Sequence, residues 1–371
     1  MNIQKLEKFL KDNNQPKFRL DQIIKAVYQD GISDFAEIST LSKDLRESLS
    51  KEMRILSFTV EKVLEAKDKQ SAKALLKLTA GHPELAEGSN DYIESVLISP
   101  KPNTFSVCVS SQVGCPMRCE FCATGKMGLK RNLTAEEITD QILFWKQYLQ
   151  KSKIQNPKSK KNLNSIIGNW DLEIGNYNIS NVVYMGMGEP FLNWEEVKKS
   201  LEILTDQKLF GFGSRSISVS TCGIPEGIEE FGKSFPQMNL AISLHFADEE
   251  KRKKYMPVAQ NYDLEKLRQS LQKYFQISNR KVFIEYVMLD GINDGKEDME
   301  KLVSYLQSVG KKQLLHVNLI RYNSASGDFK PSSKNKTENF KKYLQDNGIS
   351  ATIRKRLGDE IQGACGQLAG V

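Results

Sequence analysis

The spacing of apolar residues changes near residue 80 of the chain. Before that point apolar side chains recur three and four positions apart, as at Leu6, Phe9 and Leu10, and this period predicts helices. The stretch from Gly81 to Asn90 is rich in residues that interrupt regular structure and reads as a linker. We therefore predict a small helical N-terminal domain, with its linker, over residues 1–90.

After the linker, short β-rich runs alternate with segments of helical pattern. This alternation predicts parallel strands joined by helical crossovers, hence an α/β domain over residues 91–350. Residues 151–180 interrupt the rhythm, being rich in lysine and asparagine, and read as an inserted surface loop. Residues 351–371 are left as a C-terminal segment. The predicted strands are the runs 105–110, 181–187, 216–221, 239–244, 281–288 and 314–320.

Composition and charge narrow the class of protein. Of 371 residues, 39% are hydrophobic and 27% charged, the ordinary balance of a globular protein, and no apolar run has membrane-spanning length. The start of the chain lacks the apolar stretch of a secretory signal, so we expect a cytoplasmic protein without membrane contact. Lys and Arg number 53 against 46 Asp and Glu, and the resulting net charge of +7 permits a nucleic-acid partner without requiring one.

Three of the six cysteines crowd into one short loop after the first strand of the α/β domain. Cys115, Cys119 and Cys122 have the spacing C-x3-C-x2-C. Three thiolates can hold three irons of a cubane iron–sulphur cluster and leave the fourth iron open to a small ligand, whereas a structural zinc site normally takes four protein ligands. The alternatives are a zinc site completed by His245 or another distant residue, and three unrelated buried thiols. The spacing favours the cluster.

This loop, with Phe121 before its third cysteine, resembles that of the radical S-adenosylmethionine superfamily. The resemblance implies a partial (β/α)6 barrel, a [4Fe-4S] cluster on the three cysteines, and S-adenosylmethionine bound to the open iron. In such barrels the active site gathers at the carboxyl ends of the strands. There this chain places GMGEP, STCG, SLH and RYN. Each motif alone is weak evidence for a site, since GMGEP can be a turn and a lone histidine is usually structural. Their common position at strand ends favours a cofactor site.

The other three thiols stand apart from the loop. Cys108 alternates with two valines and so shares its strand face with Ser106 and Ser110, which predicts a side chain that faces a cavity. Cys365 lies between glycines, in a tail able to carry a thiol into a site, although alone it would be interpreted as a small buried cysteine. Cys222 carries no mark of function and is interpreted as structural.

Seven ordered motifs make a narrower resemblance. Over nearly its whole length the chain is similar to the RlmN/Cfr family of radical S-adenosylmethionine RNA methyltransferases. The resemblance implies methylation of an adenosine in 23S rRNA, position 2503 at the peptidyl transferase centre, and of adenosine 37 in some tRNAs. RlmN modifies carbon 2 of the adenine and Cfr carbon 8. The motifs are CVSSQVGC, FCATG, RNLTAEEI, MGMGEP, ISLH, IEYVMLDGIND and ACGQLAG.

The resemblance also implies a mechanism that uses two S-adenosylmethionine molecules per turnover. One methylates Cys365; the second is cleaved to a 5′-deoxyadenosyl radical, which takes a hydrogen atom from the new methyl group. The carbon radical adds to the adenine, and a proton is then lost from the ring carbon. Cys108 attacks Cys365, which forms a disulfide and frees the RNA. Glu94 matches the family's proton-accepting carboxylate, although Cys108 as thiolate could take the same proton and Glu94 alone would be interpreted as a solvent-facing residue. The residues matched to the cofactor site are Gly188, Glu189, Ser220, Ser243, Leu244, His245 and Asn323.

Substrate position and partners follow from the same resemblance. Pro190 in GMGEP favours carbon 2, while Phe210 and residues 319–323 are similar to Cfr. The implied partners are 23S rRNA, tRNA and an electron donor such as flavodoxin, and a monomer is the default expectation. The rivals are a radical enzyme that acts on a peptide or protein, and a metal-stabilised RNA-binding protein without activity. The candidate phosphate contacts are Lys126, Lys130, Arg131, Arg354, Lys355 and Arg356.

Overall fold

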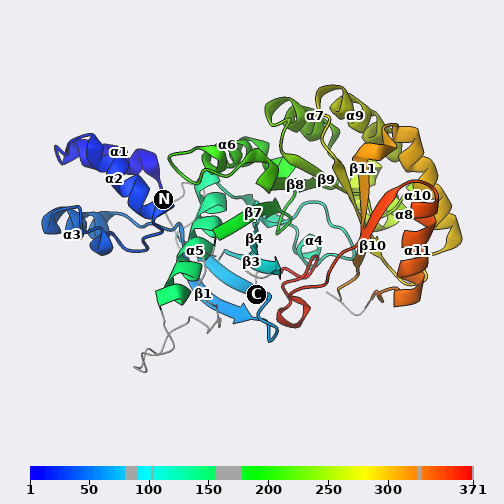
Figure 1. The fold of residues 1–371 in the computed structure, drawn as a ribbon, viewed down its shortest axis with the longest axis horizontal. Coiled ribbons are helices and arrows are strands. Elements are labelled where there is room, and N and C mark those ends of the chain that lie inside the picture. Colours follow the sequence, from blue (N-terminus) through cyan, green and yellow to red (C-terminus); the bar gives the residue numbers. More distant parts are fainter. Residues whose placement is uncertain (80–90, 102–103, 155–177, 324–327, 370–371) are drawn as a thin grey trace.

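A curved ten-stranded sheet runs through the part of the chain that the computed structural model describes, residues 1–79, 91–101, 104–154, 178–323 and 328–369 (Figure 1). The strand order is β1-β2-β3-β4-β7-β8-β9-β10-β11-β12. From β4 to β12 all neighbours are parallel, and β1 to β4 are antiparallel. The strands are β1 (Phe58–Glu65), β2 (Ser71–Leu78), β3 (Tyr92–Lys101), β4 (Thr104–Cys108), β7 (Asn178–Tyr184), β8 (Ile217–Thr221), β9 (Asn239–Ser243), β10 (Val282–Met288), β11 (Leu315–Arg321) and β12 (Ser350–Ile353).

Helices follow the parallel strands and cover the outer side of the curved sheet (Figure 1). Neighbouring helices pack against one another in the order α7, α9, α10, α11. These helices and the parallel strands form the partial (β/α) barrel, which occupies the middle and right of Figure 1. The six runs predicted as strands are β4 and β7 to β11, so the predicted α/β fold is confirmed. The helices are α5 (Ala135–Ile154), α6 (Trp194–Thr205), α7 (Pro225–Ser234), α8 (Glu249–Tyr255), α9 (Leu264–Ile277), α10 (Lys296–Val309) and α11 (Lys334–Asp346).

The prediction of helices up to residue 80 is wrong for its second half. The helical part consists of α1 (Ile3–Asp12), α2 (Phe18–Ile24) and α3 (Lys43–Glu52), whereas the residues after it form strands β1 and β2. Leucine, lysine and alanine in β2 favour a helix locally, but Ala72, Ala74 and Leu76 are fully buried in the sheet, and this burial overrides the propensity.

Two predicted segments fall on residues that are only partly described. The linker at 81–90 lies outside the described residues, as do 155–177 of the predicted insertion at 151–180. The described ends of that insertion are the last turn of α5 and the start of β7. The C-terminal segment predicted from 351 begins inside the sheet, because β12 pairs with β11.

The N-terminal helices have a hydrophobic core of their own, at the left of Figure 1. Leu6, Val27 and Leu49 are fully buried there, and Leu143 of α5 belongs to the same cluster. The amphipathic face of these short helices is thus covered by α5, which joins the helical unit to the sheet. Among the described residues, no helix combines the length and the apolar character that a bilayer crossing requires.

Helix α5 also fixes the strand that carries Cys108. Thr134 and Glu137 cap its first turn reciprocally, with Glu137 N to Thr134 Oγ1 at 3.2 Å and Thr134 N to a Glu137 carboxylate oxygen at 3.0 Å. One side of the helix buries Trp145 completely, and its Nε1 donates to Ser95 Oγ at 3.0 Å. Ser95 Oγ in turn donates to the Cys108 carbonyl at 2.9 Å. The end of β4 is therefore held from behind by a buried hydrogen-bonded chain.

Candidate active site

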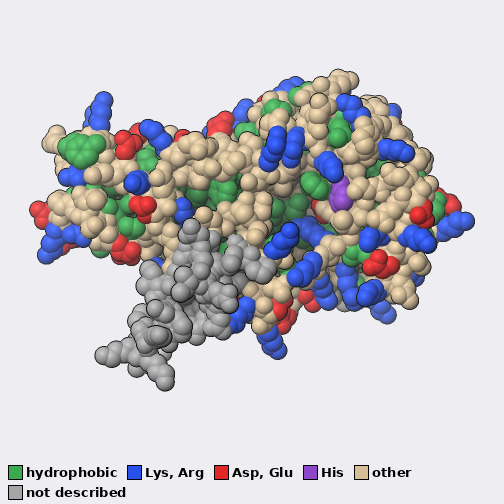
Figure 2. Space-filling model, in the orientation of Figure 1, with side chains coloured by type: hydrophobic (Ala, Val, Ile, Leu, Met, Phe, Trp, Pro, Cys, Tyr) green, Lys and Arg blue, Asp and Glu red, His purple; other side chains and the backbone are tan. Residues whose placement is uncertain are grey.

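A cavity of about 470 Å³ opens at the carboxyl ends of the parallel strands. This volume suits a ligand of nucleotide size. Figure 2 shows a hollow near the middle of this face with Lys and Arg side chains along its edge. Of the predicted site residues, the cavity lining includes Cys108, Cys115, Cys119, Cys122, Gly188, Glu189, Ser220, Ser243, His245, Asn323 and Cys365.

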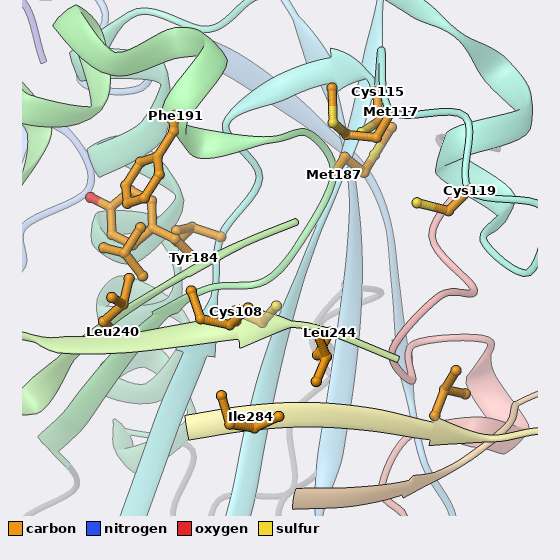
Figure 3. Packing of buried hydrophobic residues seen from close by; sticks show 14 of the residues in the cluster. Cys108, Cys115, Met117, Cys119, Tyr184, Met187, Phe191, Leu240, Leu244 and Ile284 are labelled. Carbon is orange, nitrogen blue, oxygen red and sulfur yellow. The ribbon is translucent and has the colours of Figure 1, made fainter. Parts of the chain in front are cut away.

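The cysteine loop forms one wall of this cavity. Cys115 and Cys119 are 9% and 6% exposed, and Figure 3 shows Cys119 turned toward Cys115 and Met187. Burial raises the pKa of the Cys115 and Cys122 thiols, while backbone N–H groups that approach their sulphurs, among them that of Gly125 at Cys122, oppose the rise. Thiolates here therefore need further positive charge beside them.

An iron–sulphur cluster fits this donor set. Its irons would supply the charge that the buried sulphurs lack, because a metal ion deprotonates the thiol that coordinates it. Three thiolates leave a closed structural zinc site one protein ligand short, because such a site normally takes four. Cys115, Cys119 and Cys122 are the residues that would hold the cluster.

The GMGEP motif lies against the strand-end loops. A Cβ on Gly188, whose φ is +107°, would come within 2.7 Å of Ser111 Oγ, so this glycine is required by protein packing at the cavity edge. Glu189 is 1% exposed, and its carboxylate accepts hydrogen bonds from Cys222 N at 2.7 Å and Phe191 N at 3.1 Å. Burial raises the pKa of this carboxyl group, and the amide of Cys222 limits the rise. Glu189 thus fixes the end of β8 next to the cysteine loop.

His245 is held as a neutral ring. Its Nδ1 accepts a hydrogen bond from Val287 N at 3.1 Å, which leaves the proton on Nε2, and its ring meets Phe121 edge-on at 5.1 Å between centroids. Burial lowers the pKa of His245 to about 3, and the nearby Arg252 guanidinium lowers it further in the same direction. The residue has a φ of +57°, in the left-handed region. It therefore links β9, β10 and the cysteine loop without carrying charge.

This buried histidine predicts an acid-sensitive fold. Above pH 6.5 the His245 ring is neutral in both the folded and the unfolded chain. As the pH falls from 6.5 toward 3, only the unfolded chain binds a proton at this ring, so the free energy of unfolding decreases. We expect wild type to lose about 1.4 kcal/mol per pH unit more than His245→Asn between pH 6 and pH 4. Asparagine tolerates the left-handed backbone and keeps an acceptor for Val287. Urea unfolding at several pH values measures this, and parallel slopes would refute it.

Cys108 and Cys365 lie in the same cavity with one arginine beside them. Burial, followed by the neighbouring Cys365 sulphur, raises the pKa of Cys108 to about 12, and Arg354 acts in the opposite direction. The neighbouring Cys365 sulphur raises the pKa of the Arg354 guanidinium, and the Glu285 carboxylate adds to this rise. Ser106 lines the cavity with Cys108, as their shared strand face predicts.

Hydrogen bonds dock the tail around Cys365 (red in Figure 1) beside the cysteine loop and α4 (Ala123–Met127). Ala123 N donates to Gly366 O at 2.8 Å, and Thr124 Oγ1 donates to Leu368 O at 2.6 Å. Asn323 Nδ2 reaches Cys365 O at 3.4 Å. The thiol is thereby placed inside the cavity, while its side chain stays exposed.

Comparison with known proteins identifies the family. The chain is 38% identical to "Ribosomal RNA large subunit methyltransferase Cfr" of Clostridium botulinum (strain Okra / Type B1) over 366 residues, 98% of this chain and 96% of the relative. It is 35% identical to the protein of the same name from Staphylococcus aureus, over 99% and 95% of the two chains. The chain belongs to the RlmN/Cfr family of radical S-adenosylmethionine rRNA methyltransferases.

Two further findings agree with RlmN/Cfr membership. Residues 1–55 match the family model "Ribosomal RNA large subunit methyltransferase N-terminal domain". A crystal structure described as a radical SAM methyltransferase from Sphaerobacter thermophilus superposes with a TM-score of 0.84 at 31% identity, covering 100% of this chain and 98% of that one. The predicted resemblance is confirmed, and so are the predicted cofactors, since this family uses a [4Fe-4S] cluster and S-adenosylmethionine.

The structure does not bring two predicted site residues into the cavity lining. Leu244 is fully buried in the core, between β9 and β10 in Figure 3, and does not belong to the cavity lining. Glu94 is also fully buried, and its carboxylate contacts Lys73 Nζ at 2.6 Å and accepts from Ala369 N at 2.7 Å. In this arrangement Glu94 holds the tail that carries Cys365, so its role as proton acceptor stays a prediction.

The sequence analysis gave no role at the cavity to three residues that line it, namely Arg354, Glu285 and Cys222. Arg354 was grouped with the phosphate contacts, but it lines the cavity. Glu285 lies on β10 in the otherwise apolar run VFIEYVM, and this lone charge on an inward face is a signal that could have been used. A hydrogen bond with Cys119, together with burial, raises the pKa of the Cys222 thiol. Arg131, another predicted phosphate contact, is paired with Glu137 at 2.8 Å.

Proposed function

We propose that the protein methylates carbon 2 of adenosine 2503 in 23S rRNA and of adenosine 37 in some tRNAs. The observation that carries this proposal is the placement of Cys108 and Cys365 in one cavity, beside the three-cysteine loop, in a chain of the RlmN/Cfr family. A radical enzyme that acts on peptides would need the cysteine loop but neither of these two thiols.

In the proposed reaction, Cys365 and Cys108 carry out different steps. When bound, the cluster and S-adenosylmethionine supply a radical able to remove a hydrogen atom from a methyl group. Cys365 accepts the methyl group and presents it to the adenine. After loss of one hydrogen atom the methyl carbon bonds to the ring carbon, which then gives its proton to Glu94 or Cys108, and the oxidised cluster would take up the one remaining electron. Cys108 then attacks the Cys365 sulphur: the S–S bond forms as the S–C bond to the RNA-linked carbon breaks, and that carbon keeps the electron pair and takes up a proton to complete the methyl group. The disulfide must be reduced before the next cycle.

Carbon 8 is the second candidate position. It is favoured by the relatives from Clostridium botulinum and Staphylococcus aureus, which carry the name Cfr. Pro190 supports carbon 2, and it is the first residue of the short 3-10 helix that follows Glu189. Both positions use the same thiols, so the choice depends on how the adenine enters the cavity.

RNA would reach the cavity through its basic rim. Arg321, Lys355 and Arg356 belong to the lining, and the blue side chains in Figure 2 border the hollow. Phosphate contacts here would hold an unpaired adenosine turned out of its stack. An electron donor such as flavodoxin, action as a monomer and a cytoplasmic location complete the proposal.

Mass spectrometry of digested 23S rRNA and tRNA tests the function. We expect RNA from cells that lack this protein to lose 2-methyladenosine, and the wild-type gene to restore it. Loss of 8-methyladenosine would instead support carbon 8. If both nucleosides persist unchanged, neither position is the target and the proposal fails.

A further inference from the structure

Cys365 lies at the tip of a tight turn that closes on itself. Gln367 N donates to Ala364 O at 3.1 Å, and Cys365 and Gly366 are the two central residues of the turn. Gly366 has a φ of +84°, as the second central residue of a type II turn requires. The Gln367 side chain closes the turn again, because its Oε1 accepts from Ala364 N at 3.1 Å. The place of the thiol therefore depends on how this turn is attached to the rest of the protein.

One peptide group just after the turn is held from both sides. The carbonyl oxygen of Leu368 accepts from Thr124 Oγ1 at 2.6 Å, and the N–H of Ala369 donates to Glu94 Oε2 at 2.7 Å. These two groups belong to the same trans peptide, in which they point in opposite directions. Thr124 and Glu94 are both buried. The tail is thus clamped between α4, which follows the cysteine loop, and β3.

The backbone of Glu94 is fixed as well. Its carbonyl oxygen accepts from Ser110 Oγ at 2.6 Å, and the same hydroxyl oxygen accepts from Met187 N at 2.9 Å. The Glu94 N–H points to Met187 Sδ at 3.4 Å. Glu94 is therefore connected to the segment that follows Cys108 and to the GMGEP motif, both of which border the cavity.

Lys73 supplies the counter-charge of this carboxylate from the neighbouring strand. Its Nζ lies 2.6 Å from Glu94 Oε1, and the two side chains are 6% and 1% exposed. In the antiparallel pairing of β2 with β3, Leu75 lies opposite Glu94 and Lys73 opposite Val96, so the ion pair is a diagonal contact on one face of the sheet. A buried charge that loses its partner is costly, so each of the two residues holds the other in place.

We propose that Lys73 is a positioning residue that acts through Glu94 to seat the tail and thereby places the Cys365 thiol at the cavity. The inference deepens the proposed function and rests on it for the role of Cys365 as methyl carrier. The ammonium occupies one carboxylate oxygen and so orients the other toward the Ala369 N–H. A carboxylate binds an N–H more strongly than a neutral acceptor does, so the charge of Glu94 strengthens the clamp.

The tail before the turn is attached to the same antiparallel strands (Figure 1). The loop between β1 and β2, residues 66–70, binds it twice: Lys67 N donates to a Glu360 carboxylate oxygen, and Gln70 Oε1 accepts from Lys355 Nζ at 2.6 Å. Both contacts are exposed to solvent, where polar contacts contribute little to stability. The strands β1 to β3 therefore form the dock of the tail, and Lys73 is the charged group inside it.

Hydrogen–deuterium exchange of the Ala369 amide measures how firmly the clamp holds. The cluster-loaded protein is exchanged anaerobically, and fragments that contain residues 364–369 are analysed by mass spectrometry. In Lys73→Met, which keeps a long side chain and removes its charge, we expect exchange at Ala369 to be about tenfold faster. Exchange in β9 and β10 should stay within about twofold of wild type, which a general loss of stability would not allow.

Two variants give the matched comparisons. Thr124→Val breaks the bond at the other side of the same peptide group and should also accelerate exchange at Ala369. Lys77→Met removes a lysine from the same strand and the same face of β2. Because Lys77 Nζ lies 6.0 Å from the centre of the Tyr92 ring, away from the clamp, this variant should exchange at the wild-type rate.

A double variant keeps the test decisive if Lys73→Met does not fold. Lys73→Met combined with Glu94→Gln leaves no unpaired buried charge, so it should fold. Its Ala369 amide should still exchange faster than in wild type, because the acceptor at residue 94 is then neutral. Wild-type exchange at Ala369 in the double variant or in folded Lys73→Met overturns the inference, and so does equal acceleration in Lys77→Met.

The kinetics of RNA methylation connect the seated tail to the reaction. For Lys73→Met we expect kcat to fall at least about tenfold, because the carrier sulphur is misplaced. The KM for RNA should stay within about twofold, because Lys73 lies within the sheet and not on the basic rim. An unchanged kcat despite a loosened tail, or a rise in KM alone, would overturn the positioning role. A loosened tail in a protein that methylates no RNA would support the role of Lys73 and refute only the proposed function.

Discussion

Cys365→Ala is expected to abolish RNA methylation. The variant keeps the cysteine loop and the cavity, but it has no sulphur to carry the methyl group between the two halves of the reaction. Loss of a covalent nucleophile costs about 10⁴-fold or more in turnover, so we expect no methylated adenosine above background. The measurement is incorporation of a labelled methyl group into RNA by the purified, cluster-loaded protein.

Two variants control for a general effect of removing a thiol. Cys222→Ala removes a thiol that also lines the cavity and is expected to keep most of the activity. Cys108→Ala should still accept the methyl group, but without the attacking sulphur it should leave protein and RNA joined, as a band of higher mass on a denaturing gel. Methylated RNA from Cys365→Ala at the wild-type rate would rule out a carrier role for this cysteine.

Cys119→Ala is expected to remove the iron as well as the activity. Cys119 is 6% exposed on the loop that faces the cavity, and a cubane held by three thiolates loses a third of its protein ligands with it. After anaerobic reconstitution, iron should fall from about four atoms per chain to a small residue, and the visible absorption of the cluster should vanish with it.

The neighbouring Cys222 provides the matched comparison for this experiment. Its thiol is hydrogen-bonded to Cys119, so it lies close enough to substitute as a ligand if position alone decided binding. We expect Cys222→Ala to retain its iron fully. Equal iron losses in the two variants would mean that the ligand set assigned from the C-x3-C-x2-C spacing is wrong.

The barrel could be predicted because its strands are buried on both faces. The run NLAISL, which contains β9, is rich in apolar residues, and such a run can be recognised from the sequence without knowing which strands lie beside it. Strand β2, by contrast, has the sequence SAKALLKL, whose residue types suit a helix equally well. This segment is a strand because it pairs with β1 and β3. The local spacing of apolar residues does not predict such pairing between segments.

The candidate site was predictable where one motif supplied several residues. The cysteine loop and GMGEP each contain their own spacing, and both border the cavity. Arg354 was placed at the RNA surface because a basic run, Arg354 to Arg356, usually lies in solvent. Its actual direction depends on the register of β12 against β11, where one residue of slip would reverse it. The proximity of Cys222 to Cys119 likewise arises from two loops far apart in the chain.

The docked tail is anchored to the two residues that directly follow the cysteine loop. Gly366 and Leu368 are bonded to Ala123 and Thr124, which directly follow Cys122. A rearrangement that withdraws the tail with Cys365 releases these two hydrogen bonds, which lie next to Cys122, a predicted cluster ligand. We therefore expect the visible absorption and the magnetic signals of a bound cluster to differ between the docked and the released tail, so that spectroscopy of the unlabelled protein would report the position of Cys365.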